Sequence, residues 1–171
     1  MKEILGFNLS ELADVVKAQK ADNDKFIKHI KMIKNINLDR QAQALHEEFT
    51  AKIDCLECGN CCRGLGPRLI YRDIENMARD QRMKPEQFME LYIRRDEDGD
   101  LIFKNMPCPF LNDDNHCLIY EKRPKACLEY PHTDHKKFVQ ILAMTFKNSA
   151  YCPIAYLVME SLKKGFDYKR E

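Results

Sequence analysis

Cysteine is the residue type of this chain with the clearest chemistry. All eight cysteines occur at or after residue 55, and the first four form the run Cys55-x2-Cys58-x2-Cys61-Cys62. A two-residue gap lets a loop curl so that two sulfurs converge on one metal ion, and Gly59 permits the turn. The run therefore predicts a centre that is ligated by thiolates.

The spacing of this run leaves the kind of metal open. Zinc sites normally take two cysteines from one such loop and two from elsewhere in the chain, whereas three cysteines at successive two-residue gaps are typical of a bacterial ferredoxin loop. We therefore favour an iron–sulfur cluster, most simply of the 4Fe-4S type, with Zn²⁺ as the alternative. Because adjacent side chains tend to diverge, Cys61 and Cys62 should not easily join the same centre.

Four more cysteines follow: Cys108, Cys117, Cys127 and Cys152. Two of them, Cys108 and Cys152, precede proline, as does the cysteine that ends a ferredoxin-type run. A single late cysteine could be a small buried hydrophobic residue, but a set of four beside the first run favours metal ligation. We expect all eight to be ligands, most simply in two groups of four. One centre with several packing or redox cysteines is the alternative.

Longer motifs surround the late cysteines. Cys108-Pro-Phe-Leu is followed by Cys117-Leu-Ile-Tyr-Glu-Lys-Arg-Pro-x-x-Cys127-x-x-Tyr-Pro. Together with the first run, these motifs resemble the CxxCxxCC family of zinc- or iron-chelating cysteine-cluster proteins of bacteria, which includes a domain of flagellin lysine N-methylase. The resemblance covers roughly residues 55–132, and Cys152-Pro153 is also similar to the family. It implies a cytoplasmic, thiolate-ligated centre, and its methylase branch implies a cluster that takes part in methyl transfer to lysine.

Two residues near Cys127 are candidates to stabilise the metal centre without binding the metal themselves. Four thiolates leave a net charge of about −2 on either a zinc ion or an oxidised four-iron cluster. Arg123 lies four residues before Cys127 and would share a face with it on a helix, where its guanidinium could donate to sulfur. Tyr120 is a second candidate donor. The alternatives are a solvated arginine and a core tyrosine.

The elements that must position these residues are mostly helical. We expect a small, mostly α, single domain with a helical N-terminal cap over residues 1–54. Residues 55–171 then form the cysteine-cluster region, with irregular metal-binding loops and a short β-hairpin. The apolar spacing and capping residues predict helices that begin near Asn8 (with Glu11 as its capping partner), Asp22, Asp39, Arg72, Pro85 and Pro153. Residues 138–146 fit either a strand or a helix, and we favour a helix. Leu101–Phe103 reads as a strand, and residues 110–119 read as a hairpin around 112–116.

Composition limits the partners that we expect. The 28 basic and 27 acidic residues give a formal charge of +1 and are interspersed, so nucleic acid is not an expected partner. No segment approaches the roughly 20 apolar residues of a membrane span, and the N-terminus lacks the pattern of a signal peptide. We therefore expect a cytoplasmic protein, where clustered cysteines are more often metal ligands than disulfides. Its partner would be an unidentified protein or small molecule.

Three functions remain open from the sequence. The first is an iron–sulfur protein in redox or group-transfer chemistry, with protein methylation as one form, which would make the chain a transferase or an oxidoreductase. The second is a zinc-binding structural or adaptor protein without catalysis. The third is a metal buffer with labile ligands. The sequence names no catalytic residue, substrate or oligomeric state.

Overall fold

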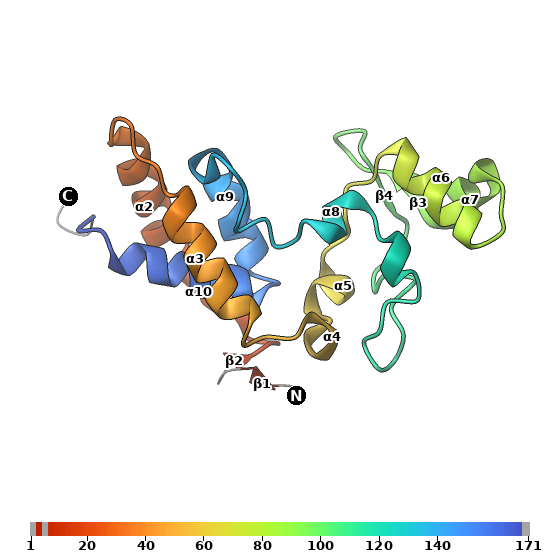
Figure 1. The fold of residues 1–171 in the computed structure, drawn as a ribbon, viewed down its shortest axis with the longest axis horizontal. Helices are drawn as coiled ribbons and strands as arrows, with labels where there is room; N and C mark the ends of the chain where they lie inside the picture. The colour runs from red at the N-terminus through yellow and green to blue at the C-terminus, as the bar shows by residue number, and fades with distance from the viewer. Residues whose placement is uncertain (1–2, 5–6, 169–171) are drawn as a thin grey trace. The chain divides into compact units, whose positions relative to one another are not determined.

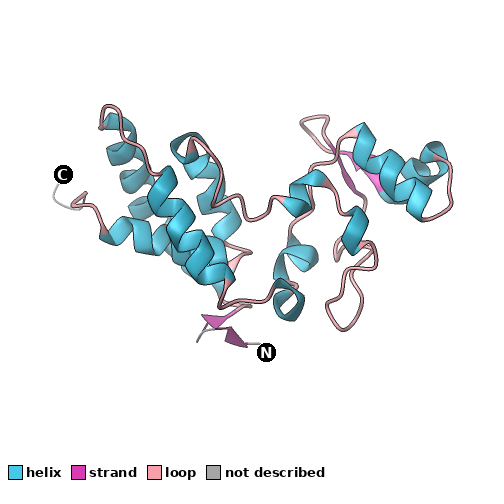
Figure 2. Ribbon diagram, viewed as in Figure 1, coloured by secondary structure: helices cyan, strands magenta, loops and turns pink. Residues whose placement is uncertain are grey.

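A computed structural model describes residues 3–4 and 7–168 and is largely helical (Figure 2), which confirms the mostly α fold class. The chain packs into two compact units. The helical unit contains the described residues up to 54 and those from 131 onward, and the cysteine unit contains residues 55–130. The helical unit thus joins the N-terminal helices with the described residues from 131 onward, and the cysteine unit lies between them in the sequence. No helix of the described residues is long and apolar enough to cross a membrane.

The helical unit is built around packed helices (Figure 1). Its elements are the antiparallel strands β1 (Glu3–Ile4) and β2 (Phe7–Asn8) and the helices α1 (Leu12–Ala18), α2 (Lys20–Met32), α3 (Asp39–Thr50), α9 (Phe138–Ser149) and α10 (Pro153–Lys164). Helix α10 packs against both α3 and α9, and α2 packs against α9. Phe26 and Ile30 are fully buried, so the apolar stripe predicted for α2 faces a core, and Phe138 and Leu142 of α9 are buried in the same unit.

The helix boundaries of this unit agree with the sequence at α9 and α10 and differ near the N-terminus. Pro153 occupies the first turn of α10, as predicted. The capping pair predicted for α1 is wrong, because α1 begins only at Leu12. The Asn8 amide instead donates to the Glu11 carboxylate at 2.8 Å, and its oxygen accepts from the Ser10 backbone at 3.2 Å. The predicted restart near Asp22 lies inside α2.

The cysteine unit has a core of its own. Its elements are α4 (Cys55–Cys58), α5 (Asn60–Gly64), α6 (Tyr71–Asp80), α7 (Pro85–Tyr92), β3 (Ile93–Arg95), β4 (Leu101–Phe103), the 3₁₀ helix η1 (Tyr120–Lys122) and α8 (Lys125–Leu128). Ile74, Met77, Phe88 and Phe110 belong to one buried cluster, against which Cys108 and Cys117 pack. Two of the late cysteines are thus held at the edge of an apolar core.

Two local expectations for this unit need correction. Residues 55–66, predicted as a loop, contain the one-turn helices α4 and α5, which are separated by Gly59 in the left-handed conformation (φ +58°). Such short helices show no apolar periodicity, so the sequence pattern could not reveal them. The hairpin of the unit is β3–β4, with Ile93 opposite Phe103. The hairpin expected around residues 112–116 is only an isolated bridge between Leu111 and Cys117.

Candidate metal centre

The structure separates the eight cysteines between the two units, and none of them forms a disulfide. The cysteine unit holds Cys55, Cys58, Cys61, Cys62, Cys108, Cys117 and Cys127. Cys152 lies in the helical unit, where it is buried and caps α10: its sulfur accepts from the Ala155 amide at 3.5 Å. This cysteine therefore has a structural role in its own helix.

Helices α4 and α5 place the first four cysteines. Cys58 is buried, Cys55 is exposed, and Cys61 and Cys62 are half-buried. The sulfurs of Cys61 and Cys62 lie 3.9 Å apart. The expectation that these adjacent side chains diverge is wrong, because their sulfurs lie within contact distance of each other.

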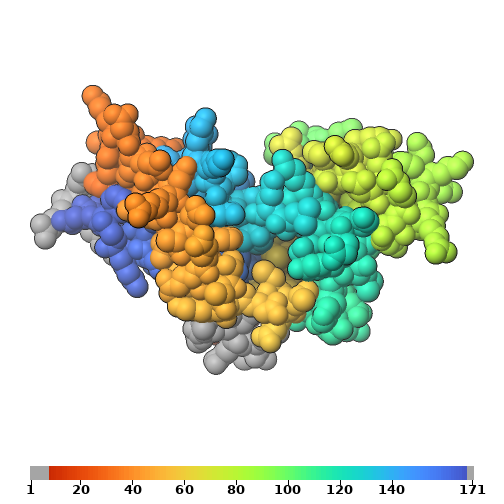
Figure 3. All heavy atoms as spheres, viewed as in Figure 1, coloured from red at the N-terminus to blue at the C-terminus, as the bar shows by residue number. Residues whose placement is uncertain are grey.

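Backbone hydrogen bonds join this segment to the late cysteines. The Cys108 amide donates to the Cys62 carbonyl at 2.8 Å. Leu111 bridges to Cys117, and the Leu118 amide donates to the Phe110 carbonyl at 2.9 Å, so Cys108 and Cys117 lie on one closed turn. In the space-filling view, the gold atoms of α4 and α5 lie beside the green and teal atoms of this turn (Figure 3). Cysteines far apart in the sequence are thus fixed in one neighbourhood.

Cys62 has a lowered pKa. The Cys61 thiol donates a hydrogen bond to the Cys62 sulfur and lowers the pKa of Cys62 to about 7, and the positive charges of Arg63 and Arg123 act in the same direction. A thiolate is the form that binds a metal ion. The surroundings of Cys62 therefore favour its ligating form.

Three other thiols show the opposite effect. Burial, with a smaller contribution from negative charge on Cys62 and Cys117, raises the pKa of Cys108 to about 11. Burial also raises the pKa of Cys127, to about 12, with contributions from Cys62, Cys108 and Cys117. The pKa of Cys117 is raised by burial and by Cys62. Cys62, Cys108, Cys117 and Cys127 thus form one electrostatic group, in which a bound cation would relieve the repulsion between thiolates.

Arg123 supports this group, although not by the predicted geometry. Arg123 (φ −54°, ψ 143°) and Pro124 (φ −52°, ψ 150°) are extended, and α8 begins only at Lys125, so Arg123 and Cys127 do not share a helix. The residue before a proline is disfavoured in the helical conformation. Nevertheless, the charge of Arg123 lowers the pKa values of Cys62, Cys117 and Cys127.

Tyr120 holds the arginine in place. The Arg123 Nε donates to the Tyr120 carbonyl at 2.9 Å, and the guanidinium carbon lies 3.6 Å from the centre of the Tyr120 ring. This distance is typical of a cation–π contact. The tyrosine is 43% exposed, so it is a platform for Arg123 and not a core aromatic.

Asn115 is a residue near the centre that the sequence analysis missed. The side-chain nitrogen of Asn115 donates to the Glu57 carbonyl at 3.0 Å, and its side-chain oxygen accepts from the Arg63 guanidinium. The same guanidinium also donates to the Cys58 carbonyl at 3.1 Å. Asparagine tolerates the left-handed conformation, which Asn115 adopts with φ +71°. The turn-forming sequence around it was visible, but its contact with residues more than fifty positions earlier was not.

The donor chemistry of the cysteine unit fits a thiophilic metal centre. Its sulfurs come from short helices and a closed turn, and the Cys61–Cys62 separation of 3.9 Å suits two ligands of one ion. Two Zn–S bonds of about 2.3 Å at a tetrahedral angle place their sulfurs about 3.8 Å apart. Within the described residues, no three His, Cys, Asp or Glu side chains already lie in a metal-binding arrangement, so the thiols would have to rearrange around a bound ion.

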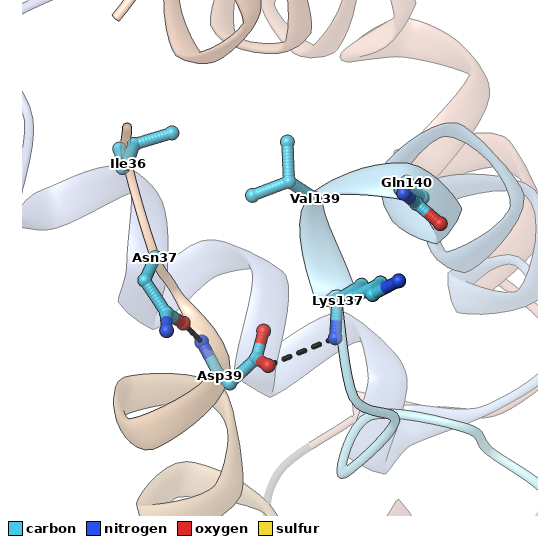
Figure 4. A pocket seen from close by; sticks show the side chains of 6 residues that line it. All are labelled: Ile36, Asn37, Asp39, Lys137, Val139 and Gln140. Carbon is cyan, nitrogen blue, oxygen red and sulfur yellow. Dashed lines mark hydrogen bonds between the residues drawn. The ribbon is translucent and has the colours of Figure 1, made fainter. Parts of the chain in front are cut away.

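The helical unit has a surface cavity that offers no comparable chemistry (Figure 4). The cavity has a volume of about 340 Å³ and is lined by Ile36, Asn37, Asp39, Lys137, Val139 and Gln140. The Asp39 carboxylate accepts from the backbone amides of Lys137 at 2.8 Å and Phe138 at 2.9 Å. These hydrogen bonds lower the pKa of Asp39. Its carboxylate therefore caps the start of α9.

Comparison with known proteins gives one match. The model of the CxxCxxCC family, described as a putative zinc- or iron-chelating domain, matches residues 54–152, which is more than half of the chain. No curated protein and no solved structure shows a significant match. The matched range includes all eight cysteines as well as Arg63, Asn115 and Arg123.

Proposed function

Since this chain belongs to the CxxCxxCC family of zinc- or iron-chelating domains, we propose that it binds its metal through thiolates of the cysteine unit. The proposed ligands come from Cys55, Cys58, Cys61, Cys62, Cys108, Cys117 and Cys127. Arg123, held by Tyr120, offsets the negative charge of the centre. Cys152 matches the family by sequence, and its sulfur caps α10.

The observation that carries the proposal furthest is the 3.9 Å separation of the Cys61 and Cys62 sulfurs. This distance is close to the edge of a tetrahedron of four sulfurs around one ion. It favours a single ion that is bound by Cys61, Cys62 and two of the late thiols Cys108, Cys117 and Cys127. A closed site of four thiolates has no open coordination position, so its role would be structural or adaptor-like.

An iron–sulfur cluster is the second candidate, and the Cys55-x2-Cys58-x2-Cys61 run favours it. Helix α4 places Cys55 and Cys58 nearly one turn apart, and the Gly59 turn leads directly to Cys61. A four-iron cluster takes one cysteine per iron, so Cys61 and Cys62 would not ligate the same iron. When bound, such a cluster supplies electron transfer or group-transfer chemistry, including the methylation implied by the family resemblance.

We also propose a cytoplasmic location, because a reducing compartment keeps all eight thiols available. A metal buffer differs from both candidates in the rate of metal loss. Buried ligands such as Cys58 and the half-buried late cysteines support slow release. Rapid transfer to a mild chelator would favour the buffer.

Metal and sulfide analysis of anaerobically purified full-length protein separates the candidates. Stoichiometric zinc, or iron without acid-labile sulfide, supports the single-ion site. Iron with sulfide and broad absorption near roughly 400 nm supports the cluster. Protein that is metal-free as purified and takes up neither ion during reconstitution would overturn the proposal.

A further inference from the structure

The turn that precedes Cys117 is closed on itself. The Asn112 backbone N–H donates to the His116 carbonyl at 2.9 Å, and the Asn115 backbone N–H donates to the Asn112 carbonyl at 3.0 Å. Asn115 adopts φ +71° in this turn and is half-buried, although its neighbours Asp113 and Asp114 are exposed. The side chain of Asn115 is therefore directed to the protein and not to solvent.

The Asn115 side chain and Arg63 together connect this turn to the end of α4. One guanidinium nitrogen of Arg63 donates to the Cys58 carbonyl at 3.1 Å and the other donates to the Asn115 side-chain oxygen. The Asn115 side-chain nitrogen donates to the Glu57 carbonyl at 3.0 Å. The last carbonyls of a helix have no partner within the helix, so these two side chains satisfy groups that would otherwise need water.

The absence of a side chain at Gly59 makes room for this connection. A Cβ atom at Gly59 would lie 2.7 Å from the Arg63 guanidinium and 2.9 Å from the Asn115 oxygen. The φ of +58° also disfavours any other residue at this position. Gly59 therefore allows both the turn between α4 and α5 and the close approach of Arg63 and Asn115 above it.

We infer that Arg63 and Asn115 are positioning residues for metal binding, an inference that rests on the proposed function. They fix the turn between Cys58 and Cys61 against the turn that leads to Cys117. This connection limits how far the early and late thiols can move apart, and so it lowers the cost of bringing them to one ion. Supporting groups of this kind, which orient ligands without binding the metal, typically contribute about 10–100-fold to metal affinity.

The test is anaerobic Co²⁺ titration of reduced full-length protein, with a competing chelator to measure affinity. Thiolate-to-cobalt charge-transfer absorption reports the number of sulfur ligands. Asn115→Gly allows the left-handed backbone conformation and removes the side-chain amide. We expect it to weaken Co²⁺ binding by about 10–100-fold and to reduce the charge-transfer intensity per ion. Asn115→Asp keeps the acceptor for Arg63, so it should recover part of the affinity.

Arg63 variants separate position from charge. Arg63→Lys keeps the positive charge but cannot reach both the Cys58 carbonyl and Asn115, so it should bind Co²⁺ as weakly as Arg63→Gln. The double variant Arg63→Gln with Asn115→Gly should be little worse than either single variant, because both remove the same connection. Asp113→Gly in the same turn and Arg68→Gln at an exposed ion pair with Asp100 are matched controls and should bind normally.

The outcomes separate this inference from the proposed function. The positioning role would be overturned, with the metal site left intact, by either of two results. One is that Asn115→Gly binds Co²⁺ with the affinity and spectrum of the wild type, and the other is that Arg63→Lys does so. If the wild type itself shows no charge-transfer absorption with Co²⁺, both the inference and the thiolate site are wrong. A lower melting temperature of the metal-free variants with an unchanged cobalt spectrum would also contradict the inference, because it indicates a purely structural role.

Discussion

At the scale of single residues, the cysteines of this chain differ in what surrounds them. Cys62 lies beside the Cys61 thiol and near two arginines, whereas Cys108 and Cys127 are half-buried and close to other thiols. Cys152 caps a helix in the other unit. The same residue type therefore has at least two roles, which individual substitutions can separate.

The first prediction compares Cys62→Ser with Cys152→Ser. Serine is a poor ligand for a thiophilic ion but a good helix N-cap. Cys62→Ser should lose most of the bound metal, whereas Cys152→Ser should retain it with little change in stability. Metal content and melting temperature of identically purified proteins check this expectation. Equal metal loss in the two variants would make Cys152 a ligand and remove the distinction drawn above.

The second prediction concerns Arg123, which is 3.6 Å from the Tyr120 ring and acts on three thiols through its charge. Arg123→Ala should lower metal affinity by about 10–100-fold. Arg123→Lys should be intermediate, because it keeps the charge but loses the planar contact with Tyr120. Competition with a chelator measures both, with Arg68→Ala as the control for loss of a surface charge. If Arg123→Ala binds like the wild type, the arginine has no role at the centre.

At the scale of elements, Asp39 joins two helices of the helical unit. It is the first residue of α3, but its carboxylate accepts from the backbone amides at the start of α9. The sequence predicted a cap at Asp39 for its own helix. The partner is almost a hundred residues away, so periodicity and capping rules alone could not identify it.

The third prediction is that Asp39→Ala destabilises the helical unit by about 1 kcal/mol, as the loss of a helix cap typically does. The pKa of Asp39 is lowered by the two amides, so its contribution is present above the ordinary value of 3.8 and is lost as the pH falls through the lower folded-state value. Denaturant unfolding at neutral pH and at about pH 3 measures the difference. Asp24→Ala, which removes an exposed pair with Lys20, is the control and should cost less. An Asp39→Ala effect no larger than that of the control would contradict the assignment.

Long, periodic elements were the ones that the sequence predicted well. Ile74, Met77 and Ala78 of α6 are fully buried as expected, and Pro85 and Pro153 start their helices. The sequence pattern failed where a few residues depend on distant contacts, as in α4 and α5. Lys163 lies in the last turn of α10. That lysine is 5% exposed and is paired with Asp22 at 3.0 Å and with Glu160.

The candidate site could be predicted in composition but not in arrangement. The cysteine spacing indicated thiolate ligation, and the family match agrees with metal binding. The approach of the Cys61 and Cys62 sulfurs depends on side-chain rotamers, which spacing does not determine. The contacts of Asn115 with Arg63 and Glu57 depend on how two distant turns pack within the cysteine unit.

At the scale of the whole molecule, the two units have separate cores, and only the cysteine unit gathers the proposed ligands. Residues 55–66 contain few apolar side chains, so metal ligation should contribute much of their order. Apolar helices such as α9 and α10 do not depend on it. Metal removal should therefore affect the two units unequally.

The fourth prediction is that chelation increases hydrogen exchange and proteolysis in residues 55–66 and 105–128, with much smaller changes in α9 and α10. A ligand at a hundredfold excess over its Kd stabilises the state that binds it by about 2.7 kcal/mol, so the effect should be easily measured. Exchange followed by mass spectrometry, before and after chelation and after metal is restored, gives the comparison. Uniform changes over both units would mean that they unfold together, and no change would mean that the metal is not structural.

The most direct measurement of the thiolate centre is X-ray absorption at the edge of the metal that the full-length protein carries after anaerobic purification. We expect a first shell made of sulfur at about 2.3 Å, in the number that a four-thiolate centre requires. An iron atom beyond the sulfur shell would identify a cluster, and the absence of such an atom would identify a single ion. A first shell of nitrogen or oxygen at about 2.0–2.2 Å would contradict ligation by the cysteines of residues 55–127.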